Sequence, residues 1–112
     1  MEVSQAEVVL CEFYFSDLKQ NKLRPVVVFK NNLPFDDFVG VPVSSRVDRL
    51  TEDEILIGKS DFLSGELPMQ SKMMVRKTFV ISKQVVVKKY GRLSDECFSS
   101  LHRAFCDYFG CA

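Results

Sequence analysis

The sequence predicts a mainly β fold that forms a small, curved barrel and ends in one α-helix. Short β-branched and aromatic runs, separated by turn residues, fill most of the chain. Apolar residues at helical spacing occur only after these runs, together with helix-capping residues. The chain has 112 residues, of which 46% are hydrophobic and ten are Phe, so it can bury one core. We therefore predict one domain over residues 1–112, with the barrel at about 7–92 and the helix at about 94–109.

The first two predicted strands form a hairpin. Residues 7–15 are β-branched and aromatic, which favours a strand. Residues 16–22 are polar and turn-prone and predict a loop. A second strand is predicted over residues 23–30. Pro25 has no N–H group, so it fits the beginning of this strand or a position without a hydrogen-bond partner.

The third predicted strand is interrupted on one face. A turn over residues 31–35 precedes it, and the strand itself is predicted over residues 37–44. Its valines alternate on one side, whereas Gly40 and Pro42 occupy the other and indicate a bend or an edge. The charged residues 45–54 have no clear period and predict a loop.

Three more strands are predicted before the helix, at residues 55–58, 73–82 and 84–90. The valines of the last one are apolar on both faces, which favours an internal position in the sheet. Residues 59–70 contain Gly and Pro and predict irregular structure with one helical turn. Residues 91–93 predict a connector to the helix.

The C-terminal helix has the clearest signals in the chain. Ser94 is a favourable N-cap, and two acidic residues follow it in the first turn. Five large apolar side chains between positions 98 and 109 share one helical face, and Gly110 predicts the end of the helix. His102 falls at the margin of this face, where a structural or solvent-facing role is expected rather than catalysis.

The composition excludes several classes of function. Lys+Arg and Asp+Glu both number 15, so nucleic-acid binding would need a local patch of positive charge. The four cysteines lack Cys-x2-Cys spacing and there is one histidine, so we expect no zinc site and reduced thiols, with Cys11 and Cys97 acting as small apolar residues. Glycine-rich phosphate loops and Gly-x-Ser-x-Gly are absent, which argues against a nucleotide cofactor and a serine hydrolase. Neither a membrane-length apolar run nor a secretion signal is seen, so we expect a cytoplasmic protein.

Two strand ends carry residues suited to phosphate chemistry. Arg24 precedes the conformationally fixed Pro25, and a guanidinium can bind a phosphate through two hydrogen bonds. Ser44 and Ser45 end the third strand and are followed by Arg46, so hydroxyl donors and a cation leave the same strand end. Taken singly, an ion-paired surface arginine and a turn serine are the more common explanations of these residues.

The order and spacing of these segments resemble the PemK/MazF family of bacterial toxins. The resemblance is carried by Ser16-Asp17-Leu18, by residues 22–28 and 41–45, and by Gly91-Arg92-Leu93-Ser94, and it covers about residues 7–109. It implies an SH3-like barrel, which is also the fold of the CcdB toxins. It further implies the toxin of a type II toxin–antitoxin pair, with metal-independent endoribonuclease activity on single-stranded RNA. No cofactor is implied.

The resemblance also assigns roles to individual residues. Arg24 and Ser44 match the family's catalytic arginine and hydroxyl residue, which would stabilise the phosphorane formed when a ribose 2′-OH attacks the adjacent phosphate. The expected substrate contacts are Ser45, Arg46, Asp17, Lys19, Lys22 and Lys77. The implied partners are single-stranded RNA, a cognate antitoxin and a second copy of the chain in a homodimer.

The sequence departs from the family at positions that bear on the chemistry. Met74 and Arg76 stand where some members have an Arg-x-Asp pair, and Arg46 stands where glutamine is common. The general base is not identified, and the candidates are Asp17 and Glu12, the carboxylates near the first loop. Two alternatives stay open: a toxin of the same fold that inhibits a protein such as DNA gyrase, and a catalytically degenerate member that acts as a binding module.

Overall fold

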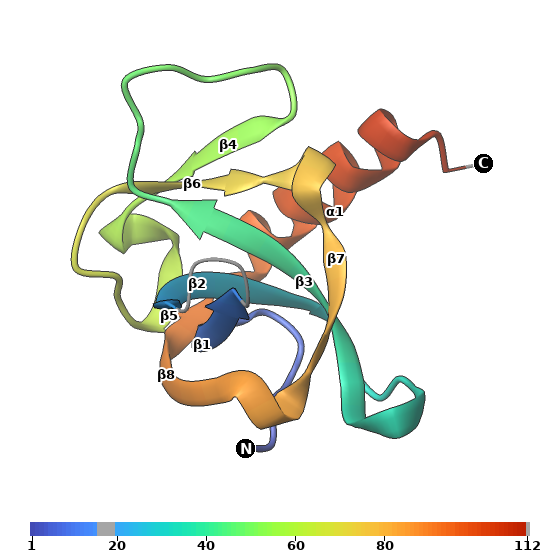
Figure 1. The fold of residues 1–112 in the computed structure, drawn as a ribbon. Helices are drawn as coiled ribbons and strands as arrows, with labels where there is room; N and C mark the ends of the chain where they lie inside the picture. Colours follow the sequence, from blue (N-terminus) through green and yellow to red (C-terminus); the bar gives the residue numbers. More distant parts are fainter. Residues whose placement is uncertain (16–19, 112) are drawn as a thin grey trace.

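The computed structural model describes residues 1–15 and 20–111 of the chain. Eight strands and one α-helix lie in this part (Figure 1). Their bounds are β1 (Glu7–Phe15), β2 (Gln20–Lys30), β3 (Asp37–Ser44), β4 (Glu54–Ile57), β5 (Phe62–Gly65), β6 (Ser71–Met74), β7 (Phe79–Ser82), β8 (Val86–Leu93) and α1 (Asp95–Phe109). Four short 3-10 turns connect them: η1 (Pro34–Asp36), η2 (Lys59–Asp61), η3 (Val75–Lys77) and η4 (Lys83–Val85).

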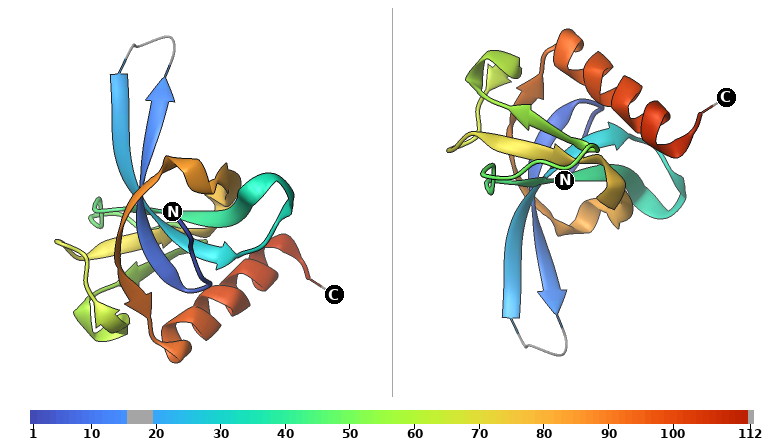
Figure 2. Two further views of the ribbon diagram at one scale, coloured as in Figure 1. Left: turned by 90° about the horizontal axis from the view of Figure 1, so that it is seen from below. Right: turned by 90° about the horizontal axis from the view of Figure 1, so that it is seen from above.

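The strands form one curled antiparallel sheet. Its order is β4-β6-β3-β2-β1-β8-β5, and β7 pairs with β3 off this path. The helix α1 packs along one side of the curl, and the β1–β2 hairpin projects from the body on the side away from α1 (Figure 2). The prediction of a mainly β barrel with a C-terminal helix is confirmed, and so is the hairpin formed by the first two strands.

The bend predicted in β3 lies where its pairing partner changes. One edge of β3 pairs with β7 as far as Gly40 and with β6 from Val43 onwards. At Gly40 a Cβ atom would stand 2.4 Å from Val26 Cγ1 of the neighbouring strand, so only glycine fits there without a shift. Pro42 occupies the interval between the two partners. The chain can therefore turn from one partner to the other at the two residues that interrupt the valine pattern.

Several element boundaries differ from the sequence-based expectation. β5 falls inside residues 59–70, which predict irregular structure, and the strand predicted over 73–82 is two strands separated by η3. The two strands of the split segment, β6 and β7, both pair with the same edge of β3, and η3 connects them. Residues 91–93, predicted as a connector, belong to β8. Gly91 pairs with Gly65, and a Cβ on Gly91 would lie 2.2 Å from the Ser64 carbonyl oxygen. This glycine permits close strand pairing instead of ending a strand.

Apolar clusters cover both faces of the central strands. The first lies between the sheet and α1 and includes Val8, Val27, Val41, Leu93 and Leu101. The second lies on the opposite face and includes Val9, Cys11, Val26, Val28 and Phe38. Because both faces are buried, β1 and β2 carry continuous valine runs instead of an alternating pattern.

The helix begins and ends at the predicted residues. The Ser94 hydroxyl oxygen accepts a hydrogen bond from Cys97 N at 3.1 Å, and Gly110 ends the helix with a left-handed backbone at φ 71°. His102 is exposed and stacks on the Phe29 ring at 5.7 Å, which agrees with a structural or solvent-facing position. Within the described residues, no helix has the length and apolar character needed to span a membrane.

Candidate functional site

Arg24 and Ser44 leave the sheet at the same end. The β2–β3 ladder runs from Lys30–Val39 to Val26–Pro42, and Arg24 and Ser44 each stand two residues beyond that last pair. Alternate residues of a strand share a face, so Arg24 lies on the face of Val26, and Ser44 lies on that of its partner Pro42. The two residues, 20 positions apart in the sequence, therefore lie on one face at one end of the β2–β3 pair.

A hollow of about 180 Å³ opens at this end of the barrel. We call it the barrel-end hollow, and its lining residues are Pro25, Ser45, Leu67, Pro68, Met69, Ser71 and Tyr90. It is smaller than the ~300–1,000 Å³ of typical small-molecule sites. Pro25 and Ser45 are the sequence neighbours of Arg24 and Ser44. Adjacent residues of a strand point to opposite faces, so Pro25 lines the hollow from the face of β2 opposite to Arg24. The hollow and the predicted pair therefore share one end of the barrel but not one face of β2.

The Ser44 hydroxyl is held by its own loop. Its oxygen accepts a hydrogen bond from Arg46 N at 3.1 Å, which closes a short serine turn after β3. A hydroxyl that accepts this bond still has its O–H to donate. The arrangement suits a donor to a phosphoryl oxygen.

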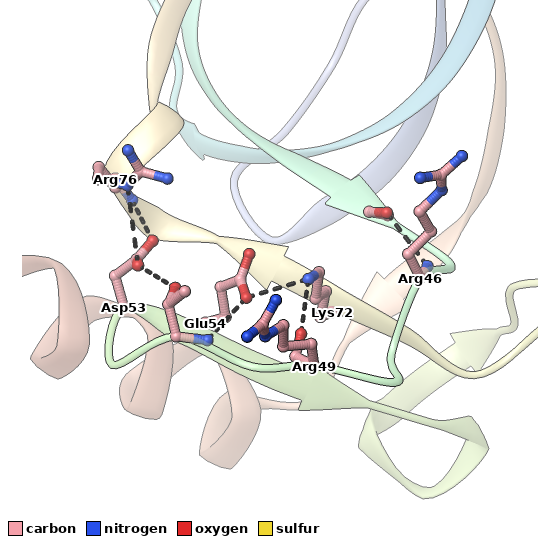
Figure 3. A network of polar contacts seen from close by, with 8 residues as sticks. Arg46, Arg49, Asp53, Glu54, Lys72 and Arg76 are labelled. Atoms are coloured by element: carbon pink, nitrogen blue, oxygen red, sulfur yellow. Dashed lines mark hydrogen bonds and ion pairs between the residues drawn. The ribbon is translucent and has the colours of Figure 1, made fainter.

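The guanidinium groups of Arg24 and Arg46 are exposed cations. In residues 1–15 and 20–111 neither group has an ion pair or a hydrogen bond. The Arg46 side chain points away from the polar network beside it (Figure 3). A chain with zero formal net charge therefore has two unneutralised arginines at one end of the barrel. Such a local positive patch is what binding of a polyanion by this chain requires.

The structure places the other predicted contact residues as follows. Ser45 lines the barrel-end hollow. Lys22 is exposed and lies in β2, because the strand begins at Gln20, earlier than the predicted loop allows. Lys77 ends η3, between β6 and β7, and so stands beside the middle of β3 instead of at its end with Ser44. Asp17 and Lys19 lie outside the described residues.

A buried ion pair supports the loop that follows Ser44 (Figure 3). Lys72 is the strand partner of Ser44, and its Nζ lies 3.0 Å from Glu54 Oε1. The same ammonium donates to the Arg49 carbonyl oxygen at 2.9 Å. The exposed fractions of the Lys72 and Glu54 side chains are 11% and 9%. Lys72 thereby ties the middle of the loop to β6, beneath the Arg46 turn.

A second carboxylate fixes the far end of that loop. Asp53 accepts from Arg76 N at 2.9 Å and from the Thr51 hydroxyl, and its Oδ1 lies 3.9 Å from Arg76 Nε. Burial alone would raise the pKa of Asp53, but these hydrogen bonds and the Arg76 charge outweigh it, so the pKa lies below its ordinary value of 3.8. The Arg76 guanidinium is thus part of the loop support, and Met74 beside it is buried.

Acid should weaken this loop support. The pKa of Glu54 is lowered chiefly by the hydrogen bond from Thr51 N and further by Lys72, against the effect of burial. Carboxyls with lowered folded-state pKa values contribute stability above their unfolded values of about 3.9–4.3 and lose it as pH falls through the folded values. We expect the urea midpoint to fall below about pH 4. An Asp53→Asn/Glu54→Gln variant should show a smaller fall, and an equal fall in both proteins would contradict the prediction.

Two residues at this end of the barrel are not predicted from the sequence. Lys72 is buried although lysine in a short strand is normally exposed. Tyr90 lines the barrel-end hollow, with Lys88 Nζ 4.8 Å from the centre of its ring. No local motif marks either residue. Their positions depend on the pairing of β6 with β3 and of β8 with β1.

The fold is shared with solved structures of toxins. An "Endoribonuclease in complex with its cognate antitoxin from Mycobacterial species" aligns over 99% of this chain and 98% of its own, with a TM-score of 0.76 and 15% identity. MazE-MazF from Deinococcus radiodurans covers 100% of both chains, with a TM-score of 0.76 and 14% identity. Mycobacterium tuberculosis toxin MazF-mt6 covers 95% of this chain and 98% of its own, with a TM-score of 0.71 and 16% identity. A search of curated protein sequences gives no match.

These structural matches confirm the predicted small SH3-like barrel of the PemK/MazF type, and at such identities they establish the fold alone. Family membership is carried by the sequence. The model of the "PemK-like, MazF-like toxin of type II toxin-antitoxin system" matches residues 4–109, nearly the whole chain. The chain therefore belongs to the PemK-like, MazF-like toxins of type II toxin–antitoxin systems.

Proposed function

We propose that this toxin is an endoribonuclease that cleaves single-stranded RNA without a metal ion. The observation that carries the proposal is the placement of Arg24 and Ser44 on one face at one end of the β2–β3 pair. The Arg24 guanidinium is exposed and has no partner among the described residues, and the Ser44 hydroxyl has its O–H available to donate. Because the proposed substrate is RNA, we propose that the protein acts in the cytoplasm.

In the proposed reaction a ribose 2′-OH attacks the adjacent phosphorus and the bond from phosphorus to the 5′-oxygen breaks. The products are a 2′,3′-cyclic phosphate and a 5′-hydroxyl. Arg24 stabilises the added negative charge of the phosphorane, and Ser44 donates to a non-bridging oxygen. The 2′-OH gives up one proton and the leaving oxygen takes one up, so no water is consumed. The general base is unassigned: Glu12 pairs with Leu23 and so lies on the face opposite to Arg24, whose partner is Cys11, and Asp17 lies outside the described residues.

The shape of the site favours a single strand over a duplex. The barrel-end hollow of about 180 Å³ can hold part of one nucleotide but not a paired helix. Unpaired bases can be splayed from the backbone and stacked on aromatic rings. Tyr90 supplies a ring in this hollow, Ser45 also lines it, and the exposed Arg46 that follows Ser45 is proposed to contact a neighbouring phosphate.

The solved relatives support an antitoxin as a partner. A cognate antitoxin occurs with the mycobacterial relative, and MazE occurs with the Deinococcus relative. We propose that this chain also binds an antitoxin, which blocks access to the RNA-binding surface. We further propose that it acts as a homodimer that binds RNA across the subunit boundary.

The test is cleavage of a 5′-labelled single-stranded RNA by the pure protein in excess EDTA. The expected products carry 2′,3′-cyclic phosphate ends, and the matched duplex stays intact. Cleavage that EDTA abolishes would contradict the metal-independent mechanism.

Intact RNA would overturn the nuclease proposal, and a supercoiling assay with DNA gyrase would then separate the alternatives. Blocked supercoiling would identify a toxin that inhibits a protein. Inertness in both assays would identify a binding module without catalytic activity, which the Met74 and Arg76 positions would explain.

A further inference from the structure

The end of α1 brings two cysteine side chains together. Gly110 N donates to the Cys106 carbonyl oxygen at 2.8 Å, and Cys111 N donates to the same oxygen at 3.0 Å. The second bond is the six-to-one bond of a Schellman motif, in which the side chains of the two bonded residues are often neighbours. Here both residues are cysteine, so the turn brings their side chains to one side of the helix end, and the neighbouring Cys111 raises the pKa of the Cys106 thiol.

The four cysteines divide into an accessible pair and two buried residues. Cys106 and Cys111 both border an open hollow of about 660 Å³ beside α1, together with His102 and Arg103. Cys11 and Cys97 are buried, and burial raises their pKa values to about 12 and about 11. A thiol reagent in solution therefore reaches Cys106 and Cys111 first.

We propose that Cys106 and Cys111 are a modification site, at which a low-molecular-weight disulfide such as oxidised glutathione closes a reversible disulfide across the end of α1. The exposed Cys111 thiolate attacks the reagent, whose S–S bond breaks and releases one thiol. Cys106 then attacks the Cys111 sulfur of the mixed disulfide and releases the second thiol. The protein loses two protons and two electrons, and the reagent gains both and is reduced to two thiols.

Two observations favour a thiol pair over a metal site. No group of three or more His, Cys, Asp or Glu side chains in the described part of the chain is arranged to hold a metal ion. His102, one turn before Cys106, is stacked on Phe29 instead of being directed at the thiols. A disulfide needs no third ligand, and reversible disulfides are the kind found in reducing compartments. The closed form would fasten the last turn of α1, which carries the exposed Tyr108 and Phe109.

The experiment treats the native protein with glutathione buffers of rising oxidised fraction, quenches with acid, unfolds it and alkylates the remaining thiols. The tryptic peptide after Arg103 contains Cys106 and Cys111, whereas Cys11 and Cys97 fall in other peptides. The expected result is that this peptide becomes lighter by two hydrogen atoms and takes up no alkylating reagent. Both other cysteines stay fully alkylated. Because the turn holds the two thiols near each other, their effective concentration is high, and less than roughly a tenth should remain as mixed disulfide.

A matched variant tests the geometry separately from the presence of two thiols. Gly110→Val keeps both cysteines but opposes the left-handed backbone, so closure should fall by about fivefold or more. Cys106→Ser should leave glutathione on Cys111. Stable glutathione on Cys111 of the wild-type protein, with Cys106 still alkylated, would overturn the proposal, and so would unchanged closure in Gly110→Val.

Discussion

Replacing Arg24 with alanine should lower the rate of single-stranded RNA cleavage by at least about a hundredfold. Removing one donor that stabilises the transition-state charge raises a barrier by on the order of 3 kcal/mol. The fold should be unaffected, because Arg24 is exposed and has no partner among the described residues. The measurement is the single-turnover rate on a labelled RNA with enzyme in excess, together with the urea midpoint of each variant.

The controls for this prediction separate position from charge. Arg103→Ala removes one arginine from α1, on the side of the molecule away from the β1–β2 hairpin, and should leave the rate unchanged. Ser44→Ala should slow cleavage, whereas Ser44→Thr retains the hydroxyl and should keep most of it. Equal rates for Arg24→Ala and the wild-type enzyme would remove Arg24 from the mechanism.

Replacing Lys72 with methionine should destabilise the protein by about 3–5 kcal/mol. The substitution leaves Glu54 as a buried carboxylate without its cation, and it frees the Arg49 carbonyl oxygen. Because Lys72 pairs with Ser44 in the sheet, cleavage should also fall at temperatures where the variant stays folded. The measurements are the free energy of unfolding in urea and the cleavage rate at about 15 °C and about 30 °C, because the Tm of such a domain shifts by roughly 4–8 °C per kcal/mol.

An exposed pair and a double variant are the controls for Lys72. Lys59 and Glu66 also form an ion pair, at 3.4 Å, but their side chains are 82% and 53% exposed. Lys59→Met should therefore change stability by less than about 1 kcal/mol. Adding Glu54→Gln to Lys72→Met removes the unpaired charge and should restore part of the loss. A Lys72→Met protein as stable as the wild type would show that the pair contributes nothing net.

Elements with local signals are predicted well from the sequence. The helix has its N-cap at Ser94 and its end at Gly110, and both signals depend only on neighbouring residues. β3 is predicted over its full length, Asp37–Ser44, because turn residues bound it on both sides. β5 and the break at η3 have no such signal. They depend on which strands pair at a distance, with β5 on β8 and both β6 and β7 on β3.

The candidate site is predicted in part for the same reason. Arg24 and Ser44 are recognised by residue type and by their place at strand ends, and their catalytic roles remain a prediction. That they share one face follows from the β2–β3 register, which no local pattern fixes. Lys72 is missed because a lysine between a serine and a methionine resembles a solvent-facing residue, and its burial depends on Glu54 arriving from another strand.

The pairing of the first strand with the last delays completion of the molecule during its synthesis. β1 pairs with β2 on one edge and with β8 on the other, and Cys11 stands opposite Val86. At ribosomal rates of about 5–20 residues per second, about 4–15 s separate the translation of these two residues. During that interval the nascent chain gains Arg24 and then Ser44, but Tyr90 has not yet been made. The barrel-end hollow, which Tyr90 helps to line, therefore cannot form until residue 90 has been translated.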